Sequence, residues 1–350
     1  MKSIRMNRTD VRLALPSKGI LQGEAEALLA ACGLAVFRPN PRQYAATIPA
    51  LPGVTVMFQR PSDIVAGIMA GTLDMGITGL DIAAEYGDTD RVLMLHDALG
   101  FGPCSLKLAV QEEAKARTMA DLAKWSRMLA ENGRSLRIAT KFTRLTSQFL
   151  NQHNIGNYEL ITVEGTLEIA PAIGYADLIA DLVSSGVTLR DNHLRPLDDG
   201  LILHSQAVLI GNRQALQVRP EVLQVARQLI EYIEAHLRAQ GSYLVIANVR
   251  GERQEAIARK MAQHPHIRGL QGPTIAPVVP HYGLSTNGEK WFAINIVVHK
   301  TDLIQAIADL RTIGGSGVIV APLTYIFEEE PERSKDLLAA TTIGRDTEDH

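Results

Sequence analysis

The sequence has little cysteine and little net charge. Of its 350 residues, only Cys32 and Cys104 are cysteines, and the formal net charge is −3. Two cysteines argue against a disulfide framework and favour a reducing compartment. A nearly neutral chain lacks the strong positive charge of a general nucleic-acid binder, so we expect no nucleic-acid partner. Local sites can still hold anionic small molecules.

Long apolar runs are also missing. None approaches the roughly 20 apolar residues that span a bilayer, and residues 1–12 lack the apolar stretch of a signal peptide. We therefore expect a cytoplasmic protein with no membrane partner. The ten histidines show no metal-ligand spacing: His264 and His266 stand two residues apart on a predicted loop, and we expect no metal site there.

Short apolar runs alternate with helical patterns over the first two-thirds of the chain. This alternation predicts an α/β fold with largely parallel sheets. The pattern restarts at residues 136–140 after a charged helix, which predicts two lobes, as in periplasmic binding proteins. Glycine and proline at residues 100–105 mark a hinge between the lobes.

The last third of the chain has a different pattern. A long amphipathic helix at residues 219–239 precedes elements in the order βαββαβ, which is the ferredoxin-like unit, of the ACT-like kind. The predicted division is a first lobe of residues 1–105 plus 195–218, a second lobe of residues 106–194, a linking helix and ferredoxin-like domain of residues 219–330, and a polar tail of residues 331–350.

One segment predicts phosphate chemistry. The predicted strand ADLIADLV is followed by a loop of Ser184, Ser185, Gly186, Val187 and Thr188. Hydroxyl groups and a glycine after a strand give a loop rich in backbone N–H donors, and a helix beginning near Thr188 would add its positive end. An ordinary turn capped by serine and threonine is the alternative interpretation.

Two acids precede this loop. Asp177 and Asp181 are four residues apart, so on a strand they point to the same face. Two carboxylates beside a phosphate loop suit the hydroxyl groups of a sugar or a bridging Mg²⁺ ion.

A family resemblance extends this interpretation. EGTLEIAPAIGYADLIADLVSSGVTLRDN (164–192) resembles the phosphoribosyl-pyrophosphate (PRPP) loop of the ATP phosphoribosyltransferases. Other segments resemble the family in the same order: LPSKGIL (15–21), FQRPSDI (58–64), LDMGITGLDI (73–82), GFGPCSLKLA (100–109) and LRIATKF (136–142). Tyr243-Leu244, Gly272-Pro273-Thr274 and GGSGVIVAPL (314–323) resemble the regulatory domain of the long form. The resemblance covers roughly residues 10–330.

The resemblance implies a reaction and a set of site residues. N1 of ATP would attack the anomeric carbon of PRPP, and pyrophosphate would leave with Mg²⁺. This is the first step of histidine biosynthesis, inhibited by histidine, in a homo-oligomeric dimer or hexamer. The implied residues are Glu168 and Asp181 for catalysis (Asp181 also for Mg²⁺, through the substrate), Asp177 and residues 184–188 for PRPP, Lys18, Gly19, Arg60 and Gly79 for ATP or pyrophosphate, and Thr274 and Ser316 for regulatory histidine.

Four departures from the family pattern keep an alternative open. Ile20 stands where the family usually has arginine, Gly100 and Ser105 replace an aspartate and an arginine, and His193 replaces a glycine. A diverged, non-catalytic paralogue that binds PRPP or histidine and regulates a partner enzyme would also fit. A periplasmic solute-binding protein is a further alternative, but the phosphate-type loop is unneeded there.

Overall fold

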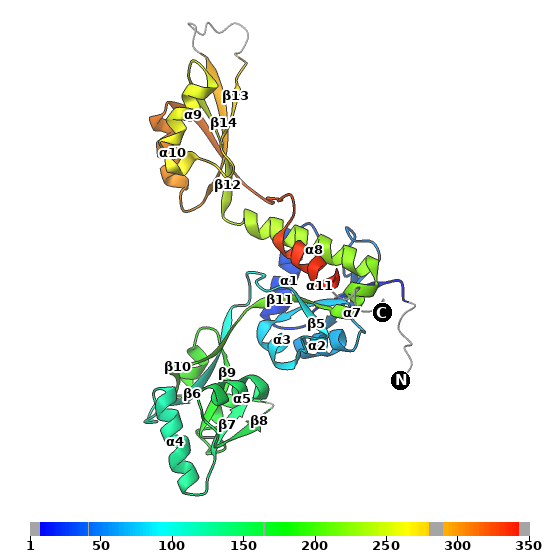
Figure 1. Cartoon of the computed structure of the whole chain (residues 1–350), viewed down its shortest axis with the longest axis vertical. Helices are drawn as coiled ribbons and strands as arrows, with labels where there is room; N and C mark the ends of the chain where they lie inside the picture. The colour runs from blue at the N-terminus through cyan, green and yellow to red at the C-terminus, as the bar shows by residue number, and fades with distance from the viewer. Residues whose placement is uncertain (1–7, 41, 164, 280–289, 343–350) are drawn as a thin grey trace. The chain divides into compact units, whose positions relative to one another are not determined.

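A computed structural model of the chain describes residues 8–40, 42–163, 165–279 and 290–342. The chain divides into two compact units, Met1–Ile230 with Glu332–His350, and Glu231–Pro331. The first unit contains two lobes, each built on its own sheet (Figure 1). No helix in the described part of the chain has the length and apolar character needed to cross a membrane.

The first lobe is built on a six-stranded sheet with the order β2-β3-β1-β4-β11-β5. β1 pairs in parallel with both β3 and β4, and a helix follows each of these three strands. α1, α2 and α3 therefore begin at the same edge of the sheet, where the strands have their carboxyl ends. The elements are β1 (Val11–Pro16), α1 (Ile20–Ala31), β2 (Ala45–Thr47), β3 (Val54–Gln59), α2 (Pro61–Met69), β4 (Met75–Gly79), α3 (Leu80–Tyr86), β5 (Val92–His96), β11 (Ala207–Asn212) and α7 (Arg213–Val218).

The second lobe is built on a five-stranded sheet with the order β10-β6-β9-β7-β8. β7 pairs in parallel with β8 and β9, whereas β6 runs antiparallel to both of its neighbours. The elements are β6 (Cys104–Gln111), α4 (Met119–Glu131), β7 (Leu136–Thr140), α5 (Thr143–Gln152), β8 (Tyr158–Thr162), the 3₁₀ helix η1 (Leu167–Ile169), β9 (Leu178–Val183), α6 (Val187–Asp191) and β10 (Leu194–Ser205).

Two short segments connect the lobes, and they correct two expectations. Residues 97–103 lead from β5 to β6, and Gln206 alone separates β10 from β11. Residues 195–205 therefore belong to the second sheet, because β10 pairs with β6, and not to the first lobe as predicted. The sheets are mixed rather than largely parallel, since every strand that borders a connection, namely β5, β6, β10 and β11, makes antiparallel pairs.

The second unit has the predicted ferredoxin-like fold. Its sheet has the order β13-β14-β12-β15, and all its pairs are antiparallel. α9 and α10 pack on one core with this sheet through Ile257, Met261 and Leu310, which are at most 1% exposed. The elements are β12 (Ser242–Arg250), α9 (Gln254–Ala262), the 3₁₀ helix η2 (Pro265–Ile267), β13 (Thr274–Pro277), β14 (Trp291–His299), α10 (Leu303–Thr312) and β15 (Gly315–Pro322). The predicted fold class, a two-lobed α/β core followed by this domain, is confirmed.

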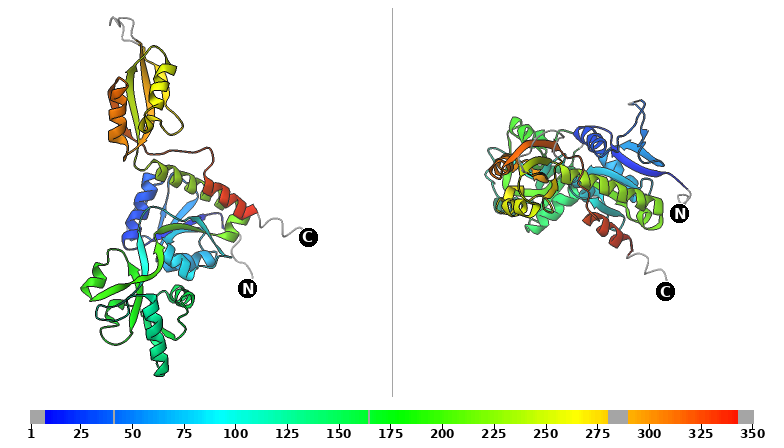
Figure 2. Two further views of the ribbon diagram at one scale, coloured as in Figure 1. Left: turned by 60° about the vertical axis from the view of Figure 1, so that its left-hand side comes forward. Right: turned by 90° about the horizontal axis from the view of Figure 1, so that it is seen from above.

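Two helices connect the units along the chain. α8 (Pro220–Ala239) leaves the first unit, and α11 (Glu332–Thr342) returns to it. α11 packs against β5 and α7 of the first lobe, and Figure 2 shows it as the red helix there. Leu337 on α11 is 3% exposed. Residues 332–342 are thus a packed helix and not the polar tail that their composition predicted; residues 343–350 lie outside the described part.

Candidate functional site

The carboxyl ends of β7, β8 and β9 meet at one edge of the second sheet. Thr140 at the end of β7 is the Cα partner of Ala180 in β9. The next residue on each chain segment is Lys141 and Asp181, so the register places an ammonium group beside a carboxylate. The loop of residues 184–188 follows β9 at the same edge. Open α/β sheets bind ligands at such an edge.

The pKa of Asp181 depends on burial and on charged groups at this edge. Burial raises the pKa of Asp181 above its ordinary value, and the carboxylate of Glu168 on η1 raises it further. The backbone N–H of Leu182, at 2.8 Å from Asp181 Oδ1, and the Lys141 ammonium group lower the pKa. Asp181 and Glu168 are therefore close enough to repel each other. A cation or a positively charged transition state beside them would relieve this repulsion.

The loop after β9 has an open, turn-like geometry. Gly186 caps α6 with φ 74°, in the left-handed region that glycine favours. The side chains of Ser184, Ser185 and Thr188 are exposed, and the Val187 N–H lies 3.5 Å from Ser185 Oγ. The loop therefore offers hydroxyl groups and backbone donors to solvent. α6 has only five residues, so little helix dipole is added to these donors.

Asp177 does not lie with Asp181. It precedes β9 at the amino edge of the sheet, about 13 Å from Asp181 at 3.3 Å per residue. There it forms a bidentate ion pair with Arg137, whose Nη2 donates to Asp177 Oδ1 at 3.0 Å and whose Nε donates to Oδ2 at 3.3 Å. The Arg137 backbone N–H also donates to Asp177 Oδ2, at 2.9 Å. Asp177 thus holds β7 beside β9.

The predicted residues of the first lobe do meet at one edge. Lys18 and Gly19 follow β1, Arg60 follows β3, and Gly79 ends β4. The Ser17 N–H donates to Gln59 O at 2.8 Å, which ties the first two loops together. Lys18 and Arg60 are exposed. Because α1 and α2 begin here, their positive ends add to the two cations, and the edge suits an anion.

Gly79 is required by close packing. A Cβ atom at this position would collide with the carboxylate of Asp81. Asp81 is buried and accepts a hydrogen bond from Ser205 Oγ at 2.6 Å, and burial raises its pKa. Since Ser205 ends β10, Gly79 lies where the first lobe meets a connection between the lobes.

The four departures from the family pattern have distinct surroundings. Ile20, at the start of α1, is 76% exposed beside Lys18. Gly100 has φ 79° in the first connection, and Ser105 Oγ lies 3.2 Å from His204 Nδ1 across β6 and β10. His193 has φ 53°, a left-handed conformation that explains why glycine is usual at this position.

The structure does not bring Thr274 and Ser316 together. Thr274 begins β13 and Ser316 lies in β15, and these are the two edge strands of the same sheet. Three strand spacings, about 14 Å, separate the two edges. One histidine molecule cannot contact both residues across the sheet of a single chain.

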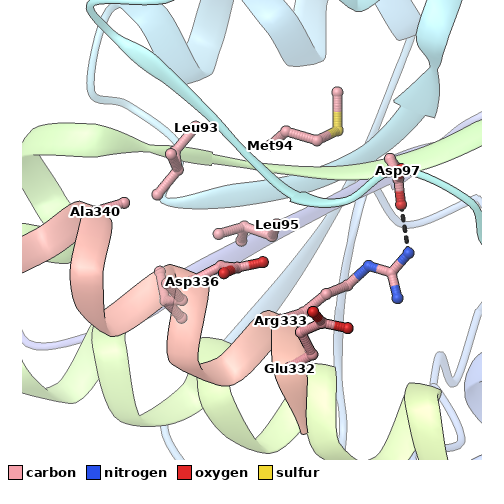
Figure 3. A pocket seen from close by; sticks show the side chains of 9 residues that line it. Leu93, Met94, Leu95, Asp97, Glu332, Arg333, Asp336 and Ala340 are labelled. Carbon is pink, nitrogen blue, oxygen red and sulfur yellow. Dashed lines mark hydrogen bonds and ion pairs between the residues drawn. The ribbon is translucent and has the colours of Figure 1, made fainter.

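Clustered metal-ligand side chains and cavities can also mark a ligand site in the described part of the chain. Among the described residues, no group of three or more His, Cys, Asp or Glu side chains could hold a metal ion. A cavity of about 390 Å³ lies between β5 and α11 (Figure 3). Arg333 Nη2 donates to Asp97 Oδ1 at 2.5 Å, and Figure 3 shows these two side chains pointing toward each other. This cavity contains none of the predicted site residues, so the two sheet edges remain the candidate site.

Sequence reasoning missed Lys141. Its signal was present, because it follows the LRIAT strand just as Lys18 and Arg60 follow their strands. Only the register of β7 against β9, however, shows which acid it faces.

Comparison with known proteins gives a consistent result. Residues 60–235 match the family model described as ATP phosphoribosyltransferase, and residues 239–325 match the model of the HisG C-terminal domain. ATP phosphoribosyltransferase 1, chloroplastic, of Arabidopsis thaliana is 42% identical over 346 residues, 96% of this chain and 82% of that protein. The ATP phosphoribosyltransferase of Rhodopseudomonas palustris strain HaA2 is 35% identical over 329 residues, 91% of this chain and 94% of that protein.

A solved structure is similar in fold. The ATP phosphoribosyl transferase (HisG:HisZ) complex from Thermotoga maritima contains a chain that aligns with a TM-score of 0.50 and 23% identity. The alignment covers 64% of this chain and 98% of that chain. At this identity the likeness shows the fold alone.

Proposed function

The chain belongs to the ATP phosphoribosyltransferase family, and from that premise we propose which of its residues bind the substrates and support the transfer. The reaction moves the phosphoribosyl group of PRPP to N1 of ATP, releases pyrophosphate and begins histidine biosynthesis. The observation that carries the proposal is the pair of sheet edges: one offers acids and a phosphate-type loop, and the other offers cations and the N-termini of α1 and α2.

The edge of the second sheet binds PRPP. Residues 184–188 hold the 5′-phosphate with hydroxyl groups and backbone N–H donors. Asp181 and Glu168 accept hydrogen bonds from the ribose hydroxyl groups. Their negative charge stabilises the positive charge that develops on the sugar as pyrophosphate leaves. Asp177 has no part in this set, because Arg137 already occupies its carboxylate at the opposite edge.

The edge of the first sheet binds the phosphate groups of ATP or pyrophosphate. Lys18 and Arg60 neutralise anionic oxygens, and the backbone at Gly19 allows a close approach, since nothing lies within 4 Å of a Cβ placed there. N1 of ATP is already a nucleophile, so the chain needs no general base. The residues act mainly by positioning and charge neutralisation, which can account for most of a rate enhancement.

Mg²⁺ fits the acids of the second edge. Mg²⁺ is commonly bound by one or two carboxylates together with substrate phosphates. Asp181 and Glu168 supply two carboxylates, and the charge of Glu168 raises the pKa of Asp181, a repulsion that a cation relieves. Bound with PRPP, Mg²⁺ would neutralise the leaving pyrophosphate.

The second unit is proposed to sense histidine. Thr274 and Ser316 are exposed on opposite edges of its sheet. A histidine molecule that contacts both must therefore lie between two copies of the chain, which supports a homo-oligomer. Histidine would inhibit by favouring one arrangement of the copies, with a coupling free energy shared by both sites.

The test is turnover of ATP and PRPP with Mg²⁺, followed by absorbance of the product with and without histidine. We expect turnover that histidine suppresses, and a loss of about 100-fold in kcat/KM for Asp181→Asn, or about 2.7 kcal/mol at 1.36 kcal/mol per tenfold change. Asp198→Asn, an exposed aspartate of the same lobe, is the control and should stay within about twofold of the parent, as for surface changes. Folded protein that binds PRPP without turnover would support the non-catalytic paralogue instead.

A further inference from the structure

Glu85 joins the two lobes of the first unit. It lies on α3 of the first lobe and is only 6% exposed. Its carboxylate accepts hydrogen bonds from the backbone N–H groups of Arg144, at 2.8 Å, and Leu145, at 2.9 Å. Thr143 Oγ1 donates a third, longer bond at 3.4 Å. These donors form the first turn of α5, which belongs to the second lobe.

This carboxylate replaces a cap that α5 lacks. The residue at the N-cap position is Phe142, and it makes no side-chain cap hydrogen bond. The first N–H groups of a helix have no partner within the helix, and a carboxylate is the favoured acceptor at this positive end. A residue 59 positions earlier in the chain supplies it. The cap therefore depends on the lobes being together.

Two neighbouring contacts strengthen the connection. Tyr86 Oη donates to Lys141 O at 3.3 Å, and Arg144 Nη2 donates to Gly87 O at 3.4 Å. Three consecutive residues of the first lobe, 85–87, thus hold the loop after β7 and the first turn of α5. Lys141 is the residue that the register places beside Asp181.

α3 consequently links the two candidate substrate edges. It begins after Gly79, at the cationic edge of the first sheet, and its last turn contacts the loop that carries Lys141, at the acidic edge of the second sheet. We infer that Glu85 is a positioning residue for the transfer: through α5 it sets the separation between the edge that binds ATP or pyrophosphate and the edge that binds PRPP. The inference rests on the proposed function, since it needs a substrate on each edge.

The predicted effect is on turnover rather than on binding to one lobe. The proposed PRPP site lies within the second lobe, so Glu85→Ala should leave the dissociation constant for PRPP within about twofold. Misplacing reacting groups by about 1 Å can cost 100-fold in rate, so we expect kcat to fall at least about tenfold. Glu85→Gln keeps one acceptor oxygen and should recover part of the rate, whereas Glu85→Asp is too short to reach both donors and should not.

Thr118→Ala is the matched control. Thr118 caps α4 within the second lobe, where its Oγ1 accepts from Asp121 N at 3.2 Å in a capping box. Removing it weakens a helix N-terminus without touching the contact between lobes. We expect a loss of stability similar to that of Glu85→Ala, measured by urea unfolding, with kcat within about twofold of the parent. If Glu85→Ala also keeps its kcat, the positioning role is refuted and Glu85 is only a cap.

A distance measurement separates this inference from the proposed function. Spin labels at D63C on α2 and K124C on α4, both exposed positions, report the separation of the lobes by pulsed electron resonance. We expect a broader distance distribution for Glu85→Ala than for the parent and for Thr118→Ala. A parent without turnover or PRPP binding would refute the proposed function, while the broadening would still support Glu85 as the link. An unchanged distribution would refute the link whatever the turnover.

Discussion

Asp177 and Asp181 are four residues apart in one segment, and asparagine at the two positions should have opposite effects. Asp177 is one partner of a bidentate ion pair with Arg137, with side chains 13% and 31% exposed. Asp181 makes no such pair; burial and Glu168 raise its pKa. Asp177→Asn therefore removes a charge that stabilises the folded chain through its ion pair. Asp181→Asn removes a charge whose burial destabilises the folded chain.

The size of the first effect follows from the ion pair and the hydrogen bonds that the substitution weakens. Hydrogen bonds to charged groups contribute about 1.5–3 kcal/mol, and breaking a fully buried ion pair costs about 3–5 kcal/mol. Arg137 is nearly a third exposed, so solvent relieves part of this cost, and asparagine keeps one acceptor. We expect Asp177→Asn to lower the free energy of unfolding by about 2 kcal/mol and to leave PRPP affinity and kcat within about twofold.

Urea unfolding measures the stability of each variant, and calorimetric titration on the same preparations measures its affinity for PRPP. We expect Asp181→Asn to weaken PRPP binding or turnover without loss of stability. If Asp177→Asn abolishes PRPP binding while its unfolding midpoint is unchanged, the placement of Asp177 at the amino edge is refuted. The sequence-based assignment of both acids to PRPP would then be restored.

Three further outcomes follow from buried groups. Asp74 is 1% exposed and paired with two arginines, so Asp74→Ala should lower the free energy of unfolding by about 3 kcal/mol or more, measured in urea against the exposed control Asp63→Asn. Burial raises the pKa of Cys32 to about 12 and raises that of Cys104. Cys32 is buried and Cys104 is half-buried, so both thiols should react slowly with iodoacetamide at pH 8 until urea is added. Fast labelling of both thiols in the folded chain would contradict the raised pKa values. Because the folded pKa of Asp181 is raised, its ionised form disfavours folding above that pKa. Asp181→Asn should be more stable than the parent at pH 8, and this difference should disappear as the pH falls below the ordinary value of 3.8.

Sequence patterns predicted the parts of the site that belong to single loops. Lys18, Arg60 and the loop of residues 184–188 each follow a strand directly, and parallel strands bring such loops to one edge. Alternating apolar runs were therefore enough to predict two lobes and a phosphate-type loop at residues 184–188, whereas Lys18 and Arg60 were candidates only through the family resemblance. The ferredoxin-like order was readable for the same reason, because each element carries its own periodicity.

Contacts between segments that are distant in the chain could not be predicted from the sequence. The partner of Asp177 is 40 residues earlier, and the strand spacing of two residues predicts only a shared face, not which end of the sheet is involved. The pairing of β10 with β6, and the packing of α11 on β5, likewise depend on tertiary contacts that composition does not reveal. The proposed roles of Thr274 and Ser316 stay predictions that depend on a second copy of the chain.

Position 20 lacks the cation that the family usually has there. Ile20 is 76% exposed at the start of α1, so arginine would fit there without disturbing the core. A cation in the first turn opposes the helix dipole at a cost of about 0.3–1 kcal/mol, but it adds positive charge at the proposed anion edge. Ile20→Arg should therefore lower KM for ATP several-fold at low salt, and the gain should shrink at high salt as exposed charges are screened.

Ile20→Gln is the control for that change, since it adds length and polarity without charge. If both variants keep the parent KM at low salt, Ile20 does not face bound phosphate, and the N-termini of α1 and α2 with Lys18 and Arg60 supply the field alone. If arginine lowers KM and glutamine does not, the chain has kept an anion site that works with one cation fewer than its family usually provides. The departure is then a matter of affinity, and the diverged, non-catalytic alternative loses one of the four departures that favoured it.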